Sequence, residues 1–177
     1  MIVLLIGVPD SGKSHKAEEI ATELAAGGPL YYIATMVPYG EEGRKRVAKH
    51  RKMRKGKGFT TVECPLEITS LVHILPDLPC AVCLLECLSN LVGNEMHRDG
   101  ADAKNLADRI TTEVLTLAQN ARHTVIVSND FPADDPQYDA DTKDYVSLLS
   151  AVNRRLANHA DRLLIFTEGE WKNREDT

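Results

Sequence analysis

The residues best suited to chemistry lie between Gly7 and Ser14. The segment matches the pattern G-x-x-x-x-G-K-[ST], which is typical of a phosphate-binding loop (P-loop). Glycines in such a loop let backbone N–H groups turn toward phosphate oxygens. Lys13 can reach the β- and γ-phosphates, and the Ser14 hydroxyl can ligate Mg²⁺. The predicted nucleotide-binding residues of this loop are Gly7, Val8, Pro9, Asp10, Ser11, Gly12, Lys13 and Ser14.

The sequence on either side of the loop supports this interpretation. The apolar run 2–6 before it is typical of a strand, and residues 13–26 after it are typical of a helix. The N-terminus of that helix would add the positive end of its dipole to the phosphate site. A glycine turn that matched the pattern by chance would need neither a strand before it nor a helix after it, so the presence of both favours a P-loop.

Residues 44–57 form a strongly basic segment. They include nine lysines and arginines and no acid, although the net charge of the whole chain is −5, so the remainder sums to −14. Such a segment on an acidic body indicates a polyanionic partner, either nucleotide phosphates or a nucleic acid. No aromatic residue interrupts the run, which argues against stacking on single-stranded nucleic acid, so we expect no nucleic-acid partner.

One histidine, His50, lies within this basic segment. It could be an incidental residue of a solvated basic helix. It could instead be a nucleophile aimed at phosphorus, because neighbouring cations keep the imidazole neutral and stabilise charge on a transferring phosphoryl group. The residues alone leave both interpretations open.

Three polar residues fall at or near the ends of expected strands. Glu86 could share a Mg²⁺ ion with Ser14, or it could be an acid favoured by the N-terminus of the following helix. Glu63 could contact a ligand or be a surface carboxylate. Asn129 could face the site or only cap a turn.

The remaining pattern predicts an α/β fold with a mainly parallel sheet flanked by helices, because apolar strands alternate with helical segments. Strands are expected at 2–6, 30–34, 59–63, 81–86, 124–129 and 162–167. Helices are expected at 13–26, 41–53, 65–73, after the strand at 81–86 as far as about residue 96, and at 102–121 and 142–158, before a polar tail at 168–177. Ligands of such sheets bind beyond the carboxyl ends of the strands. The apolar stripe of residues 102–121 must be covered by something, within the chain or between subunits.

The 177 residues are expected to form a single P-loop nucleotide-binding domain over 1–177. No run approaches the length of a membrane span, and the apolar N-terminus lacks the basic flank of a signal peptide, so we expect a cytoplasmic protein. Cys80 and Cys83 are spaced like a metal or redox pair. On a strand they would point to opposite faces, which favours reduced thiols.

Several short motifs recur in one order along the chain: SGKS at 11–14, YIAT at 32–35, Arg46 with His50 and Arg54, TVE at 61–63, LLECL at 84–88, VSND at 127–130, and Asn153 to Asp161. Together they resemble the bifunctional adenosylcobinamide kinase / adenosylcobinamide-phosphate guanylyltransferase family of cobalamin biosynthesis over nearly the whole chain.

The resemblance implies a P-loop NTPase-type (RecA-like) fold, a homotrimer and the ligands GTP, ATP and Mg²⁺. It implies phosphorylation of adenosylcobinamide, followed by transfer of GMP from a covalent adduct on His50. Beyond the P-loop, it implies nucleotide contacts from Ile33, Ala34, Thr35, Arg51, Lys52, Met53, Arg54, Glu63 and Glu86.

The chain departs from the family pattern at Pro9-Asp10 and across residues 130–150, which include Val146, Ser147 and Ser150. These departures predict an altered acceptor or the loss of one of the two activities. Two other functions fit the residues. One is a P-loop kinase of another small molecule, with His50 only binding phosphate. The other is a nucleotide-binding regulatory protein that has lost catalysis.

Overall fold

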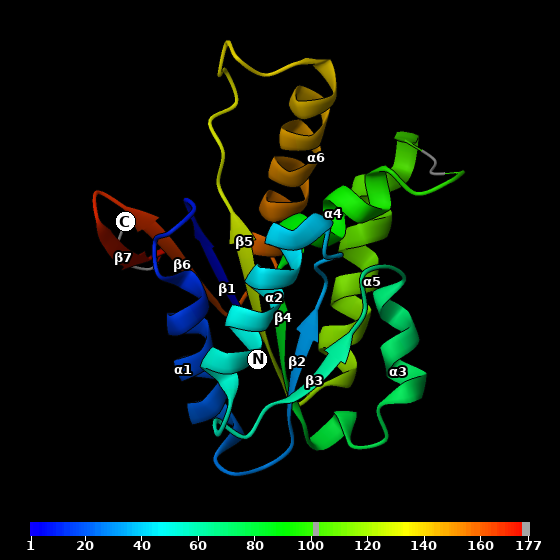
Figure 1. The fold of residues 1–177 in the computed structure, drawn as a ribbon. Helices are drawn as coiled ribbons and strands as arrows, with labels where there is room; N and C mark the ends of the chain where they lie inside the picture. Colours follow the sequence, from blue (N-terminus) through cyan, green and yellow to red (C-terminus); the bar gives the residue numbers. More distant parts are fainter. Residues whose placement is uncertain (101–102, 175–177) are drawn as a thin grey trace.

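A computed structural model describes residues 1–100 and 103–174. A seven-stranded sheet runs through the molecule in the order β3-β2-β4-β5-β1-β6-β7, and helices cover both of its faces (Figure 1). The strands are β1 (Ile2–Gly7), β2 (Leu30–Ala34), β3 (Thr60–Glu63), β4 (Val82–Glu86), β5 (His123–Asn129), β6 (Arg162–Thr167) and β7 (Glu170–Asn173). The helices are α1 (Lys13–Ala25), α2 (Gly40–Arg54), α3 (Leu71–Ile74), α4 (Leu88–Met96), α5 (Leu106–Asn120) and α6 (Ala140–Ala157).

The first six strands pair in parallel, which confirms the predicted α/β sheet. The central strands are continuous apolar runs because they are buried on both faces. Successive side chains alternate between two cores: Val3 and Leu5 pack with α1 on one face, and Leu4 packs with α4, α5 and α6 on the other. The carboxyl ends of the parallel strands therefore meet at one edge, where the P-loop lies (Figure 1).

The apolar stripe of α5 is covered within the chain itself. Leu106, Ile110, Val114 and Leu117 are all buried in the core that α5 shares with α4 and α6. The helix begins at Leu106, later than the expected start at Asp102, which lies outside the described residues. A 3₁₀ turn at Ala103–Asn105 precedes it.

Two expectations about local structure were wrong. The helix expected at 65–73 is a 3₁₀ turn at Ile68–Ser70 followed by the short α3, because Glu67 has a φ of 50° that no α-helix accommodates. The expected polar tail contains β7, which pairs antiparallel with β6. Its two-residue turn, Glu168-Gly169, has positive φ at both positions, as a type I′ hairpin requires. Residues 175–177 of that tail lie outside the described part of the chain.

Candidate nucleotide site

The P-loop joins β1 to α1 at the carboxyl edge of the sheet. Gly7, its first residue, is tightly enclosed: a Cβ atom there would lie 2.9 Å from both Phe166 Cβ and Ser11 Oγ. Gly12 has a φ of 77°, which favours glycine. Lys13 is buried, and its ammonium group donates to Val8 O at 2.7 Å. The lysine is thus folded back over the loop, where phosphate oxygens would meet it.

Ser14 and Glu86 meet across the base of this loop. The Ser14 hydroxyl donates to Glu86 Oε1 at 2.9 Å, which brings the first turn of α1 to the end of β4. Burial raises the pKa of Glu86 to about 7, although the Ser14 hydrogen bond and the Lys13 charge both favour its ionised form. Burial also lowers the pKa of Lys13, against the opposing charge of Glu86.

This pair fits a magnesium ion. Glu86 Oε2 is buried and has no hydrogen-bond partner among the described residues, and it lies beside a hydroxyl that P-loops use as a metal ligand. Mg²⁺ usually takes one or two protein ligands and completes its shell with phosphates and water. Accordingly, the described residues hold no cluster of three or more His, Cys, Asp or Glu side chains that could bind a metal unaided.

The end of β2 supports Glu86 from the neighbouring strand. The Thr35 hydroxyl donates to Cys87 O and accepts from Cys87 N–H, both at 2.8 Å, and its side chain is fully buried. Ile33 lies in the core, whereas Ala34 is partly exposed. Thr35 therefore fixes the backbone next to Glu86, a role that the sequence did not reveal.

The basic helix α2 is attached to the rest of the fold near its C-terminal end. Arg54 is buried, with its guanidinium 3.5 Å from the centre of the Tyr32 ring and Nη2 3.5 Å from Thr61 Oγ1. Three residues later, Lys57 donates to the buried Glu18 of α1 at 2.5 Å. Among the described side chains of α2, only Arg54 is buried. The helix thus docks through its last turn.

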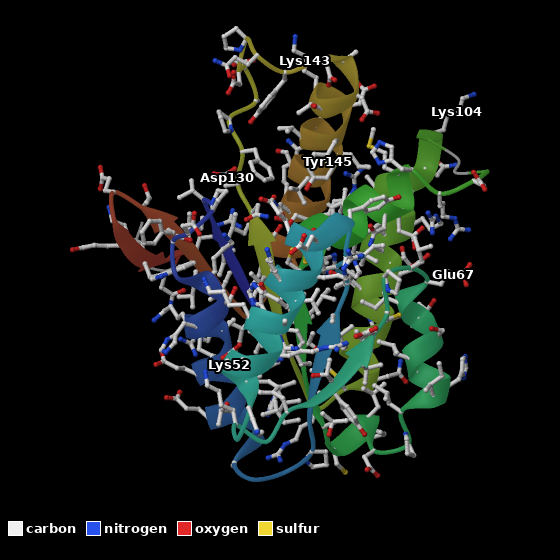
Figure 2. The ribbon with its side chains drawn as sticks, viewed as in Figure 1. Lys52, Glu67, Lys104, Asp130, Lys143 and Tyr145 are labelled. Atoms are coloured by element: carbon white, nitrogen blue, oxygen red, sulfur yellow. The ribbon has the colours of Figure 1, made fainter. Side chains whose placement is uncertain are left out.

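The other predicted residues of this region are spread over the surface of α2 and β3. Arg51 forms an ion pair with Glu63, and both side chains are more than half exposed. Lys52 is exposed on α2 (Figure 2), His50 is half-buried, and the Met53 side chain lies outside the described residues. The structure therefore brings Arg51 and Glu63 to each other, and Lys13, Ser14 and Glu86 to one point.

A shallow depression of about 520 Å³ adjoins the last turn of α2. Besides Arg51, Lys52 and Arg54, it is lined by Lys55, Gly56, Gly58, Phe59 and Thr61, none of which was among the predicted site residues. The two glycines both have φ near 80°. Their close spacing after a basic helix was the one available signal for a turn that shapes a site here.

The sequence missed residues that support the site from further along the chain. Trp171 of β7 packs against Phe166, with ring centres 5.3 Å apart, and its ring reaches within 3.3 Å of a Cβ built at Gly7. The C-terminal hairpin thus forms one wall of the P-loop. Tyr32 and Glu18 anchor α2, and their partners could not be recognised before the fold was known.

Comparison with known proteins identifies the family of this chain. A model of the family described as cobinamide kinase / cobinamide phosphate guanyltransferase matches residues 3–172. The chain belongs to this family. The predicted resemblance is thereby confirmed, and the chain is an enzyme of the cobinamide kinase / guanylyltransferase type, which acts on cobinamide with a nucleotide in cobalamin biosynthesis. No curated protein matches the chain significantly.

One solved structure supports the fold. The chain is similar to the ATPase domain of G40P, with a TM-score of 0.57, 9% identity and coverage of 94% of this chain and 69% of the other. It also matches the flagellar accessory protein FlaH of Methanocaldococcus jannaschii, with a TM-score of 0.48, 14% identity and coverage of 97% and 75%. The first likeness confirms the expected P-loop NTPase fold. No helix within the described residues has both the length and the apolar character needed to cross a membrane.

Proposed function

We propose that this member of the cobinamide kinase / guanylyltransferase family phosphorylates adenosylcobinamide and transfers GMP to the resulting phosphate, and that the departures at residues 130–150 slow the transfer without abolishing it. The observation that carries the proposal is the convergence of Lys13, Ser14 and the partly buried Glu86 at the carboxyl edge of the sheet. This group of residues suits a nucleoside triphosphate with its metal, and ATP and GTP are the donors we assign to it.

In the kinase step, the acceptor hydroxyl attacks the γ-phosphorus and releases its proton to water, and the bond from the γ-phosphorus to the departing nucleoside diphosphate breaks. Lys13 supplies positive charge to the transferring group, and the P-loop N–H groups hold its neighbouring phosphates. Ser14 and Glu86 would hold Mg²⁺, which neutralises charge on the phosphate oxygens.

In the transferase step, His50 is the proposed nucleophile. A ring nitrogen attacks the α-phosphorus of GTP, so that an N–P bond forms as the bond to pyrophosphate breaks. A phosphate oxygen of cobinamide phosphate then attacks the same phosphorus, the N–P bond breaks, and free His50 is restored. The lysines and arginines around His50 on α2 would stabilise the charge that develops on the phosphoryl oxygens.

For the predicted nucleotide residues beyond the P-loop, we propose graded roles. Ala34 would border the nucleotide at the end of β2, and Ile33 and Thr35 would act only through their backbones because their side chains are fully buried. Arg51, Lys52 and Arg54 would bind it from the depression beside α2, and Glu63 would act through its ion pair with Arg51. Met53 is assigned a nucleotide contact by the family resemblance alone. We also propose that the enzyme is a homotrimer, a property implied by its family. The exposed side chains of α2 offer surface that a neighbouring subunit could cover.

The protein mass after incubation with GTP and Mg²⁺ tests the transferase proposal. We expect the chain to gain the mass of one GMP, and we expect the gain to be lost in His50→Ala and after mild acid, because phosphoramidates are acid-labile. His73→Ala, a change at an exposed histidine of α3, is the matched control and should retain the adduct. Absence of the adduct from the unmodified enzyme would reject His50 as the nucleophile.

One observation favours a second function, a P-loop kinase without the transferase step. The residues for phosphoryl transfer are brought together at the carboxyl edge of the sheet, whereas His50 lies on a helix docked through its last turn. In that case, GTP and Mg²⁺ would leave no adduct, yet cobinamide would still be phosphorylated by a nucleoside triphosphate.

A further inference from the structure

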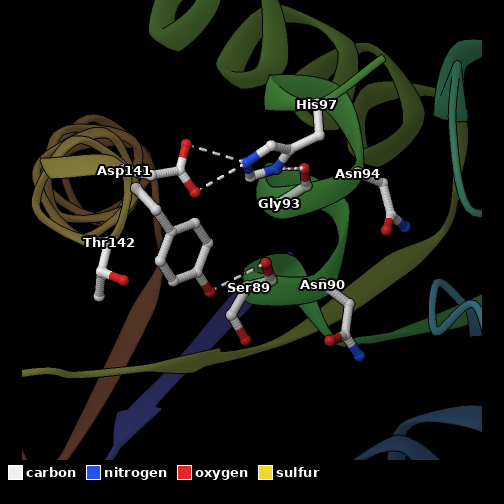
Figure 3. A pocket seen from close by; sticks show the side chains of 8 residues that line it. Ser89, Asn90, Gly93, Asn94, His97, Asp141 and Thr142 are labelled. Atoms are coloured by element: carbon white, nitrogen blue, oxygen red, sulfur yellow. Dashed lines mark hydrogen bonds and ion pairs between the residues drawn. The ribbon is translucent and has the colours of Figure 1, made fainter. Parts of the chain in front are cut away.

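A second cleft opens on the other face of the sheet, between α4 and the first turns of α6. Its volume is about 330 Å³, and its walls include Ser89, Asn90 and Asn94 of α4 with Thr142 and Tyr145 of α6 (Figure 3). The first turns of α6 project beyond the carboxyl edge of the sheet (Figure 1), so the cleft lies at the same edge as the P-loop. None of these residues takes part in the nucleotide site described above.

Apart from an ion pair at one end, the walls of this cleft are neutral and carry hydrogen-bonding groups. The described residues that line it include amides and hydroxyls but no lysine or arginine, which makes it a poor phosphate site. Asn90 is half-buried, and its side-chain amide makes no hydrogen bond to the described residues. Tyr145 donates to Ser89 O at 3.1 Å, and burial raises the pKa of its phenol to about 12, so it remains protonated.

An ion pair closes one end of the cleft. His97 Nε2 lies 3.1 Å from Asp141 Oδ2, and Nδ1 lies 2.9 Å from Gly93 O (Figure 3). Both partners are acceptors, so both ring nitrogens donate only in the imidazolium form, and these contacts raise the pKa of His97. The pair, whose side chains are both more than half exposed, joins the end of α4 to the start of α6.

Hydrogen bonds connect the cleft to the P-loop. Ser89 Oγ accepts from Asn129 Nδ2 at 2.6 Å and lies 3.0 Å from Cys87 Sγ, beside Glu86. Asn129 is the register partner of Gly7, the first residue of the P-loop. Asp130 and Tyr145 both lie beyond the carboxyl end of β5 (Figure 2). The cleft and the phosphate site are therefore on the two sides of the same strand ends.

We propose that this cleft binds the acceptor, by holding carboxamide groups at the edge of the cobinamide ring. This inference rests on the proposed function, because it takes cobinamide as the acceptor. Cobinamide carries neutral carboxamides around its corrin ring, and neutral amides and hydroxyls are the groups that recognise them. The cleft is smaller than a corrin, so it receives one edge, and the reacting side chain extends toward the P-loop. Asn90 is the principal specificity residue because its amide is available for pairing.

Equilibrium dialysis of cobinamide, followed by corrin absorbance, tests this assignment without any nucleotide. We expect Asn90→Leu to weaken cobinamide binding roughly tenfold, because an acceptor amide loses its partner in the cleft. Tyr145→Phe should weaken it severalfold. The matched controls are Asn120→Leu at the end of α5 and Tyr138→Phe in the loop before α6, neither of which lines the cleft, and both should bind normally.

The GMP adduct is measured on the same proteins, because its formation needs no acceptor. Asn90→Leu should form the adduct as the unmodified enzyme does, which also shows that the variant is folded. Normal cobinamide binding by both cleft variants, or no binding by the unmodified enzyme, would overturn the inference. Weakened binding in the cleft variants of an enzyme that forms no adduct would support the cleft while rejecting the transferase proposal.

Discussion

Lys13 is the residue on which nucleotide binding should depend most. It is buried, and its ammonium group already lies over the P-loop through its bond to Val8 O. Lys13→Ala should weaken GTP binding by about 10- to 100-fold, because charge-assisted hydrogen bonds to phosphate are lost. Titration calorimetry measures this effect. Lys16→Ala, on the same helix, should bind GTP normally, and equal affinity of the two variants would contradict the P-loop assignment.

Glu86 should make metal-dependent binding sensitive to pH. Its pKa, raised to about 7 by burial, means that the ligand-free fold favours the protonated acid. The protonated form of Glu86 therefore contributes fully to the free energy of unfolding below the ordinary carboxyl pKa. This contribution is lost as the pH rises through about 7. Mg²⁺ needs the carboxylate, so the affinity for Mg²⁺–GTP should rise between about pH 6 and pH 8. Calorimetry at several pH values should show this rise in the unmodified enzyme and a flat profile in Glu86→Gln.

At the scale of elements, the docking of α2 onto the rest of the fold should depend on the ion pair between Lys57, three residues after the helix, and Glu18 of α1. Glu18 is almost fully buried, so Lys57→Met would leave a buried carboxylate without its cation and should lower the free energy of unfolding by about 2 kcal/mol. Urea denaturation measures the loss. Lys45→Met is the control, because its pair with Glu41 is exposed at both ends and should contribute about 0.5 kcal/mol or less. Equal effects of the two changes would refute this anchor.

An element could be predicted from the sequence where a local residue pattern determines it, and could not where backbone angles or distant strand pairing determine it. The P-loop, β4 and β5 could be predicted because their glycines and apolar runs are local patterns. The start of α5 and the residues 65–67 were misassigned because backbone angles, not periodicity, set those boundaries. β7 was missed because its four residues gain a partner only when β6 is placed beside them.

The candidate site divides in the same way. Ser14 and Glu86 could be paired in advance because both follow strands whose carboxyl ends share an edge. The contacts of Arg54 with Tyr32 and of Arg51 with Glu63 could not, because they depend on how α2 docks. Nor could the cleft, which exists only where α4 and α6 converge.

For the whole molecule, the predicted homotrimer still has to be tested. The stripe of α5, which could have indicated a subunit interface, is buried inside the chain, so the expectation of a homotrimer rests on the family. Light scattering at micromolar concentration should give three times the chain mass of 19.6 kDa. A mass of a single chain would contradict the trimer and leave α2 exposed in solution.

The position of Trp171 allows nucleotide binding to be followed by intrinsic tryptophan fluorescence. It is the one tryptophan in the sequence, and its indole borders the P-loop at Gly7, so its emission should respond when phosphates order the loop. Stopped-flow fluorescence could then follow nucleotide arrival and departure in real time without a label. At a GTP concentration near the Kd of the unmodified enzyme, Lys13→Ala should show little change in emission. Each step of turnover that reorganises the P-loop would thus change the intensity of the Trp171 fluorescence.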